Sequence, residues 1–140
     1  MGKRILLALA AAAVLSLPAA ALATKFNTHV SANTAPDQDR IYGVVQSGDF
    51  ACEKRREVRL YGPDFSGKRG AQGFRRYGET KTNRFGEYAF SAFFTITKQG
   101  NGGFPQGEYF VRALRKDFPD DVCRRADSNS VFIINNNNVD

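Results

Sequence analysis

Apolar and polar side chains alternate along residues 87–97 more regularly than elsewhere in the chain. The odd positions are mostly polar or small, and the even positions are all apolar: Tyr88, Phe90, Ala92, Phe94 and Ile96. Successive side chains of a β-strand point to opposite faces of its sheet, so this period of two predicts a strand with one buried and one solvent-facing side. The helical period of 3.6 residues is not sustained between residues 40 and 134. This patterning predicts a fold built from strands.

Similar short segments, bounded by Gly, Pro, Asn and Asp, lie on either side of this one. Gly86 ends the linker that begins at Asn83, and a glycine there can adopt the positive φ of a hairpin turn. Roughly seven short strands separated by turns predict an all-β fold with the size of a two-sheet β-sandwich. The other segments are residues 40–45, 57–61, 74–82, 107–114 and 131–134.

Residues 1–23 have the pattern of a cleaved secretory signal peptide. Lys3 and Arg4 precede an uncharged apolar run over residues 5–17, Pro18 ends that run, and the small-x-small sequence of residues 21–23 suits a signal peptidase. The alternative is a membrane anchor, but a spanning helix needs about 20 apolar residues. We therefore expect a secreted protein, periplasmic or extracellular, with no membrane span in the mature chain.

The remaining chain divides by composition. Residues 24–39 are polar with no sustained period, so they are predicted to be a flexible N-terminal segment with at most a short edge strand around residues 26–30. Residues 40–134 hold the strand pattern and are predicted to be the β-sandwich domain. Residues 135–140 are rich in asparagine and are predicted to be a disordered tail.

The chain has two cysteines, Cys52 and Cys123. Export to an oxidising compartment favours a disulfide between them, and the long loop that it closes would contribute roughly 4 kcal/mol of stability. The alternative is a pair of free thiols used in redox or metal chemistry. Neither a C-x-x-C motif nor a neighbouring histidine supports that alternative.

The chain is basic, with a formal net charge of +6. Its positive residues form short, separated clusters at residues 54–56, 75–76 and 124–125, whereas a nucleic-acid-binding protein concentrates charge on one face. These clusters are interpreted as a solvated basic surface, and no nucleic-acid partner is expected. The alternative is a polyanionic partner such as an acidic glycan or a cell-wall polymer.

No group of residues forms a recognisable catalytic or metal motif. The only histidine lies in the segment predicted to be flexible, and the aspartates of one turn lack the spacing of a calcium loop. The candidate carboxylates for glycoside hydrolysis are interpreted as ordinary outward-facing strand acids, because a small sandwich seldom has a cleft deep enough for that reaction. We therefore expect no catalytic residue, no cofactor and no metal. The residues considered are His29; Asp117, Asp120 and Asp121; and Glu79, Glu87 and Glu108.

Tyrosines and arginines offer a tentative binding surface, because aromatic and arginine side chains favour recognition. The alternative is that they form ordinary cross-strand pairs on a sheet. The residues are Tyr42, Tyr61, Arg75, Arg76 and Tyr77.

The order of four motifs resembles the carboxypeptidase regulatory-like domain, a transthyretin-like (prealbumin-like) β-sandwich found in many secreted bacterial proteins. The motifs are I-x-G-x-V at residues 41–45, V-x-L at 58–60, T-N-x-x-G-x-Y-x-F at 82–90 and G-x-Y-x-V-x-A at 107–113. The resemblance covers residues 40–134 and implies a seven-stranded Greek-key sandwich with a non-catalytic accessory, folding or adhesive role. The sequence departs from the family in a long loop over residues 46–56 and a long segment between Leu60 and Thr82.

These observations predict a small, non-enzymatic binding or structural module of the cell envelope or extracellular space. Its partner would be a protein, a peptide or a glycan at the cell surface. The alternatives are a small secreted hydrolase, an inhibitor of such a hydrolase, and self-association through an exposed sheet edge.

Overall fold

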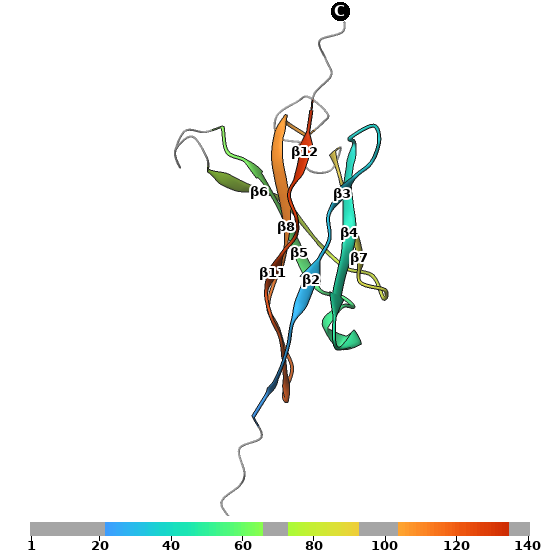
Figure 1. Cartoon of the computed structure of the whole chain (residues 1–140), viewed down its shortest axis with the longest axis vertical. Helices are drawn as coiled ribbons and strands as arrows, with labels where there is room; N and C mark the ends of the chain where they lie inside the picture. Colours follow the sequence, from blue (N-terminus) through green and yellow to red (C-terminus); the bar gives the residue numbers. More distant parts are fainter. Residues whose placement is uncertain (1–21, 66–72, 93–103, 135–140) are drawn as a thin grey trace, which may run out of the picture.

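A computed structural model describes residues 22–65, 73–92 and 104–134 (Figure 1). Almost all of the expected signal peptide (residues 1–21), the predicted tail (135–140), and the far half of the most strongly alternating segment (93–97) lie outside the described residues. The described parts form β1 (Thr24–Phe26), β2 (Thr28–Val30), β3 (Asn33–Thr34), β4 (Arg40–Ser47), the 3-10 helix η1 (Phe50–Cys52), β5 (Glu57–Pro63), β6 (Phe74–Lys81), β7 (Glu87–Ser91), β8 (Gly107–Ala113), β9 (Lys116–Asp117), β10 (Asp121–Cys123), β11 (Ala126–Asp127) and β12 (Val131–Ile133).

Within these ranges the strands make three sheets. One sheet has the order β11-β8-β5-β6, and β12 also pairs with β8. A second is centred on β4, which pairs with β2, β3 and β7, and a small third sheet has the order β1-β10-β9. All of these pairs are antiparallel except β1 with β10. The all-β class predicted from the sequence is confirmed.

The two larger sheets bury alternate residues in one shared core. Ile41 and Val45 come from β4, whereas Leu60 comes from β5 and Tyr109 and Val111 from β8, and all are fully buried. The intervening residues of these strands point to the outer side. Two sheets that share one core in this way are consistent with a β-sandwich. In Figure 1, β4 and β8, one from each of these two sheets, both run along the long axis.

Residues 24–39, expected to be a flexible segment, contain three short paired strands, all within residues 24–34. β1 pairs with β10, while β2 and β3 both pair with β4. Val30 and Ala32 are buried in the core. The pairing extends beyond the edge strand expected at residues 26–30. The segment looked flexible because strands of two or three residues are too short to show an alternating pattern.

Cys52 in η1 and Cys123 in β10 form the predicted disulfide, with their Cα atoms 5.5 Å apart and a sequence separation of 71. Both cysteines are buried. A disulfide of this kind indicates a non-reducing environment. In the parts of the chain that the structure describes, no helix is long and apolar enough to cross a membrane.

Candidate ligand-binding face

The outer face of the β11-β8-β5-β6 sheet carries aromatic and charged side chains. Because Val58 and Leu60 of β5 point into the core, the alternating residues Arg59 and Tyr61 point outward. In the sheet register Tyr61 lies opposite Phe110 of β8. We call this side of the sheet the outer sheet face.

An aromatic cluster occupies the middle of the outer sheet face. The rings of Tyr61 and Phe110 are stacked, with centroids 5.2 Å apart and planes within 9° of each other. Phe74 meets Phe110 edge to face at 5.1 Å. All three rings are half-buried. Offset and edge-to-face arrangements are the favourable geometries for aromatic pairs, so the cluster has a defined shape.

The guanidinium of Arg112 lies over this cluster. Its Cζ atom is 5.2 Å from the ring centroid of Tyr61 and 5.5 Å from that of Phe110. Its Nε and Nη2 atoms donate to the two carboxylate oxygens of Asp127 at 2.6 and 2.7 Å. The hydrogen bond to Asp127 raises the pKa of Arg112, and the same contact lowers the pKa of Asp127. A bidentate carboxylate fixes the orientation of the guanidinium plane.

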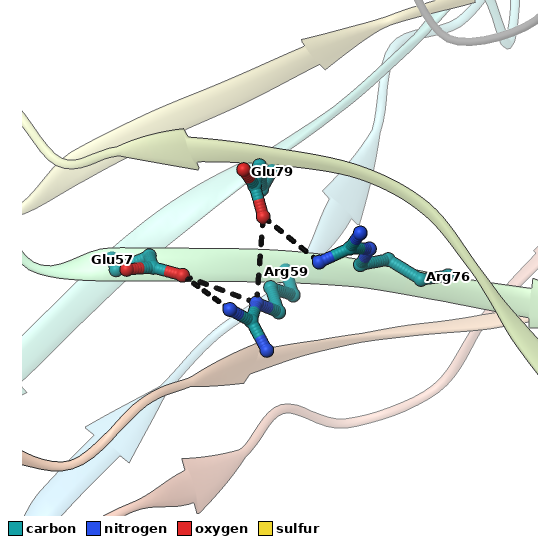
Figure 2. Close-up of polar contacts among 4 residues, drawn as sticks. All are labelled: Glu57, Arg59, Arg76 and Glu79. Carbon is teal, nitrogen blue, oxygen red and sulfur yellow. Dashed lines mark hydrogen bonds and ion pairs between the residues drawn. The ribbon is translucent and has the colours of Figure 1, made fainter.

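Four residues of the outer sheet face, two arginines and two glutamates, form an ion-pair network (Figure 2). Arg59 Nη2 donates to Glu57 Oε1 at 2.7 Å, and Arg59 Nε lies 3.6 Å from Glu79 Oε2. The same Glu79 oxygen accepts from Arg76 Nη1 at 3.0 Å. The hydrogen bond to Glu57 raises the pKa of Arg59. Exposed ion pairs contribute little stability, so the network chiefly holds the arginines in place.

Two arginines lie directly opposite one another in this face. Arg59 of β5 pairs in register with Arg112 of β8. Like charges at such positions repel, and here each guanidinium is matched by its own carboxylate, Glu57 or Asp127. The arrangement leaves two oriented guanidinium groups beside a half-exposed aromatic surface.

The structure separates the residues of the predicted binding surface. Tyr61 and Arg76 lie on the outer sheet face, opposite one another in register. Arg75 lies on β6 with its guanidinium 4.7 Å from the ring centroid of Tyr77. Tyr42 lies in the other sheet, on β4, where it is exposed. The five residues therefore do not form one surface.

Tyr77 belongs to the core rather than to a surface. The register shifts between Leu60 and Tyr61, and this irregularity leaves Tyr77 without an opposite residue on β5. A bulge re-aims a side chain, and the Tyr77 ring packs edge to face against Tyr109 at 5.3 Å. Its hydroxyl donates to the Pro63 carbonyl at 2.8 Å.

Sequence reasoning missed Phe110 and Arg112, although the alternation of β8 contained the signal. Within the predicted strand at residues 107–114, the alternate residues Tyr109, Val111 and Ala113 are apolar, and the structure buries all three. The residues between them must then point outward, beside β5. Identifying β5 as the neighbour required the sheet order.

Arg56 was interpreted as part of a solvated basic cluster, and the structure corrects this: its side chain is fully buried. The guanidinium donates to the carbonyls of Cys52 (3.0 Å), Cys123 (3.3 Å) and Arg124 (2.6 Å), and also to the carbonyl of Leu114. Burial lowers its pKa to about 10, so it is charged at neutral pH. Arg56 has the same parity as Val58 and Leu60, which point inward, and this was the overlooked signal.

The residues considered for catalysis or metal binding lie on several strands and one turn. His29 is exposed on β2, and the three glutamates lie on different strands: Glu79 on β6, Glu87 on β7 and Glu108 on β8. Asp117 pairs with Arg115 at 2.7 Å. No group of three or more metal-ligating side chains occurs among the described residues.

Comparison with protein-family models, curated proteins and solved structures gives no match to the chain.

Proposed function

We propose that this protein is a small, secreted, non-enzymatic binding module of the cell envelope or extracellular space, and that it contacts its ligand through the outer sheet face. The single observation that carries the proposal is the Arg112 guanidinium, held by Asp127 over the stacked rings of Tyr61 and Phe110. Aromatic and arginine side chains dominate binding hot spots because they offer large contact areas and oriented donors.

The chemistry of the face suits a ligand with both a flat apolar surface and hydrogen-bond acceptors. The rings offer stacking, and the guanidiniums offer donors beside them. Three arginines and three carboxylates balance the charge, so the face favours a peptide or a glycan over a polyanion. The charged residues are Arg59, Arg76, Arg112, Glu57, Glu79 and Asp127.

We further propose that the two larger sheets form a Greek-key sandwich of the carboxypeptidase regulatory-like kind. The sandwich is seven-stranded if β2 with β3, which both pair with β4, and β11 with β12, which both pair with β8, are each counted as one interrupted strand. The four motifs at residues 41–45, 58–60, 82–90 and 107–113 support this proposal, as does the core that both sheets share. The disulfide between Cys52 and Cys123 supports secretion, since such bonds persist outside reducing compartments. Cleavage after Ala23 would make Thr24 the first residue of the exported protein, which N-terminal sequencing would establish.

Glycan and peptide arrays probed with the chain that begins at Thr24 would test the binding proposal. The variants are Tyr61→Ala and Arg112→Gln, and the matched control is Tyr42→Ala, an exposed tyrosine on the other sheet. For each ligand that the arrays identify, we expect at least tenfold weaker binding to the two variants and unchanged binding to the control.

Two results would count against the proposal. One is a ligand whose affinity falls for Tyr42→Ala but not for the outer-face variants. The other is the absence of any binding to peptides or glycans by a chain whose circular dichroism shows the folded β-sheet form. Thermal unfolding of each variant separates lost contacts from lost structure.

A further inference from the structure

A cationic pocket lies between the loop after η1 and the turn that joins β6 to β7, apart from the outer sheet face. Its volume is about 480 Å³, within the range of small-ligand sites. Three cations, two polar residues and one aromatic ring line it: Lys54, Arg55, Arg84, Thr82, Asn83 and Phe85.

Backbone contacts join the two walls of this pocket. The Arg55 N–H donates to the Thr82 carbonyl at 3.1 Å, and the Thr82 N–H donates to the Arg56 carbonyl at 2.9 Å. The Thr82 hydroxyl accepts from the Arg56 N–H at 2.7 Å and donates to the Glu53 carbonyl. The loop after η1 is therefore hydrogen-bonded to Thr82, the residue at which the turn between β6 and β7 begins.

The turn is held by its own side chain. Asn83 Oδ1 accepts from the N–H groups of Phe85 at 2.8 Å and Glu87 at 3.0 Å, and Gly86 has a φ of 79°. An added Cβ at Gly86 would lie 2.4 Å from the Val45 carbonyl oxygen. The turn conformation thus requires glycine, and the positions of Arg84 and Phe85 are fixed by it.

The charge of the pocket is uncompensated. No carboxylate lines it, and within residues 22–65, 73–92 and 104–134 no ion pair involves Lys54, Arg55 or Arg84. The two acids next to these residues in sequence each accept a hydrogen bond: Glu53 from the Ser47 N–H at 2.8 Å, and Glu87 from Asn83 Nδ2 at 2.7 Å. This contrasts with the outer sheet face, where each arginine has a carboxylate partner.

The conformation of Arg55 adds a second, independent observation. Its φ is 50°, in the left-handed region that non-glycine residues rarely adopt. Such backbone strain occurs more often at ligand sites than elsewhere. Lys116, which donates to the Ala51 and Lys54 carbonyls at 2.8 and 2.9 Å, holds the same loop.

We propose that this pocket binds the carboxylate of an acidic sugar, such as a uronate residue of an anionic glycan. Lys54 and Arg55 would contact the carboxylate, and the exposed ring of Phe85 would stack against the apolar face of the sugar ring. The Phe85 ring is 57% exposed, and the guanidinium of Arg84 lies 4.6 Å from its centroid, so charge and aromatic surface are adjacent. This site shares no residue with the outer sheet face and does not depend on the function proposed for that face.

Isothermal titration of the chain that begins at Thr24 with a trigalacturonate would test the inference. The parallel titrants are the uncharged galactose trisaccharide, inorganic sulfate and inorganic phosphate. The variants are Lys54→Gln with Arg55→Gln, and Phe85→Ala. The control pair removes the same charge elsewhere, at the exposed residues Lys25 and Arg115, both changed to Gln.

We expect the trigalacturonate to bind, the neutral sugar not to bind, and affinity to fall at least tenfold in the double variant and in Phe85→Ala but not in the control pair. Higher salt should weaken binding. Loss in the control pair equal to that in the double variant would mean attraction by net charge alone and would overturn the site. Sulfate or phosphate binding as tight as the trigalacturonate, or no trigalacturonate binding at millimolar concentration, would overturn the sugar assignment.

Discussion

Replacing Arg56 tests the most unusual feature of the fold, a buried guanidinium whose hydrogen bonds go to four backbone carbonyls. Two of those carbonyls, of Cys52 and Cys123, belong to the disulfide residues themselves. Arg56 therefore joins the same two segments as the disulfide. We expect Arg56→Met to destabilise the protein strongly, although methionine preserves most of the apolar stem.

The magnitude depends on the acceptors that lose their donor. Each buried acceptor left without a partner costs about 1–3 kcal/mol, while removing the charge returns part of its desolvation penalty. With four acceptors, two of them in buried bonds, we expect a net loss of about 3–4 kcal/mol for Arg56→Met. A net stability of about 5–15 kcal/mol makes this a large fraction of the total.

Urea unfolding followed by far-ultraviolet circular dichroism would measure the loss. Arg56→Lys keeps the charge but lacks the planar fork, so its stability should lie between those of the wild type and Arg56→Met. Arg115→Met is the control, because Arg115 is exposed with a single ion pair to Asp117, and should change stability by less than about 0.5 kcal/mol. A stability of Arg56→Met within about 0.5 kcal/mol of the wild type would refute the reasoning about the carbonyls.

Three other parts of the fold give further predictions. Burial raises the pKa of Tyr88 and Tyr109, so these two side chains ionise at lower pH in the unfolded chain than in the folded one. Stability should therefore fall as the pH rises above about 10, by about 1.4 kcal/mol per pH unit for each ring. Their phenolate absorbance should appear only as circular dichroism reports unfolding. An added Cβ at Gly43 would lie 1.8 Å from a backbone oxygen of the N-terminal segment, so Gly43→Ala should lower the free energy of unfolding, measured in urea, by about 2–3 kcal/mol. The control Gly48→Ala should be nearly neutral, because its added Cβ would make only an ordinary contact at 3.6 Å. Equal effects of the two changes would mean that the N-terminal segment does not pack on β4. Hydrogen bonding to Arg112 lowers the pKa of Asp127, so the stability that this carboxylate contributes is present above its unfolded pKa and is lost as the pH falls through its folded pKa. In an acid titration Asp127→Asn should therefore lose less stability below about pH 4 than the wild type. An equal loss in both proteins would contradict the contact.

Alternation predicted the strands that are long enough to display it. β4, β5, β6, β8 and β12 fall close to the predicted segments, and β7 begins at the predicted residue. The disulfide was also predictable, because two cysteines in an exported chain allow only one intramolecular pairing. β2 falls within the short edge strand expected around residues 26–30. β1, β3 and β9 to β11 were missed because each has only two or three residues and is defined by its pairing with another strand.

The binding surface was less predictable, for two physical reasons. Tyr77 is an extra residue of β6 with no opposite residue on β5, so its side chain points into the core while Arg76 stays on the outer face. No local sequence pattern predicts such a bulge. The partners of Tyr61 depend on sheet order, because Phe110 is 49 positions away in sequence and becomes its neighbour only when β8 pairs with β5. Parity within a strand was reliable, whereas adjacency between strands was not.

The buried Arg56 helps to fix the conformation of the loop over residues 50–56. Loops on protein surfaces are usually the most mobile segments, yet this one is held by the disulfide at Cys52, by Arg56, and by Lys116 from β9. Apolar side chains packed in place of Arg56 and Lys116 could give the protein equal stability, since a buried, hydrogen-bonded charge adds little net free energy of folding. Apolar contacts are not directional, however, and would not fix the backbone around Lys54 and Arg55. Holding Lys54 and Arg55 in place would lower the entropy cost of binding the proposed anionic ligand, so under that proposal the same contacts would serve recognition as well as folding.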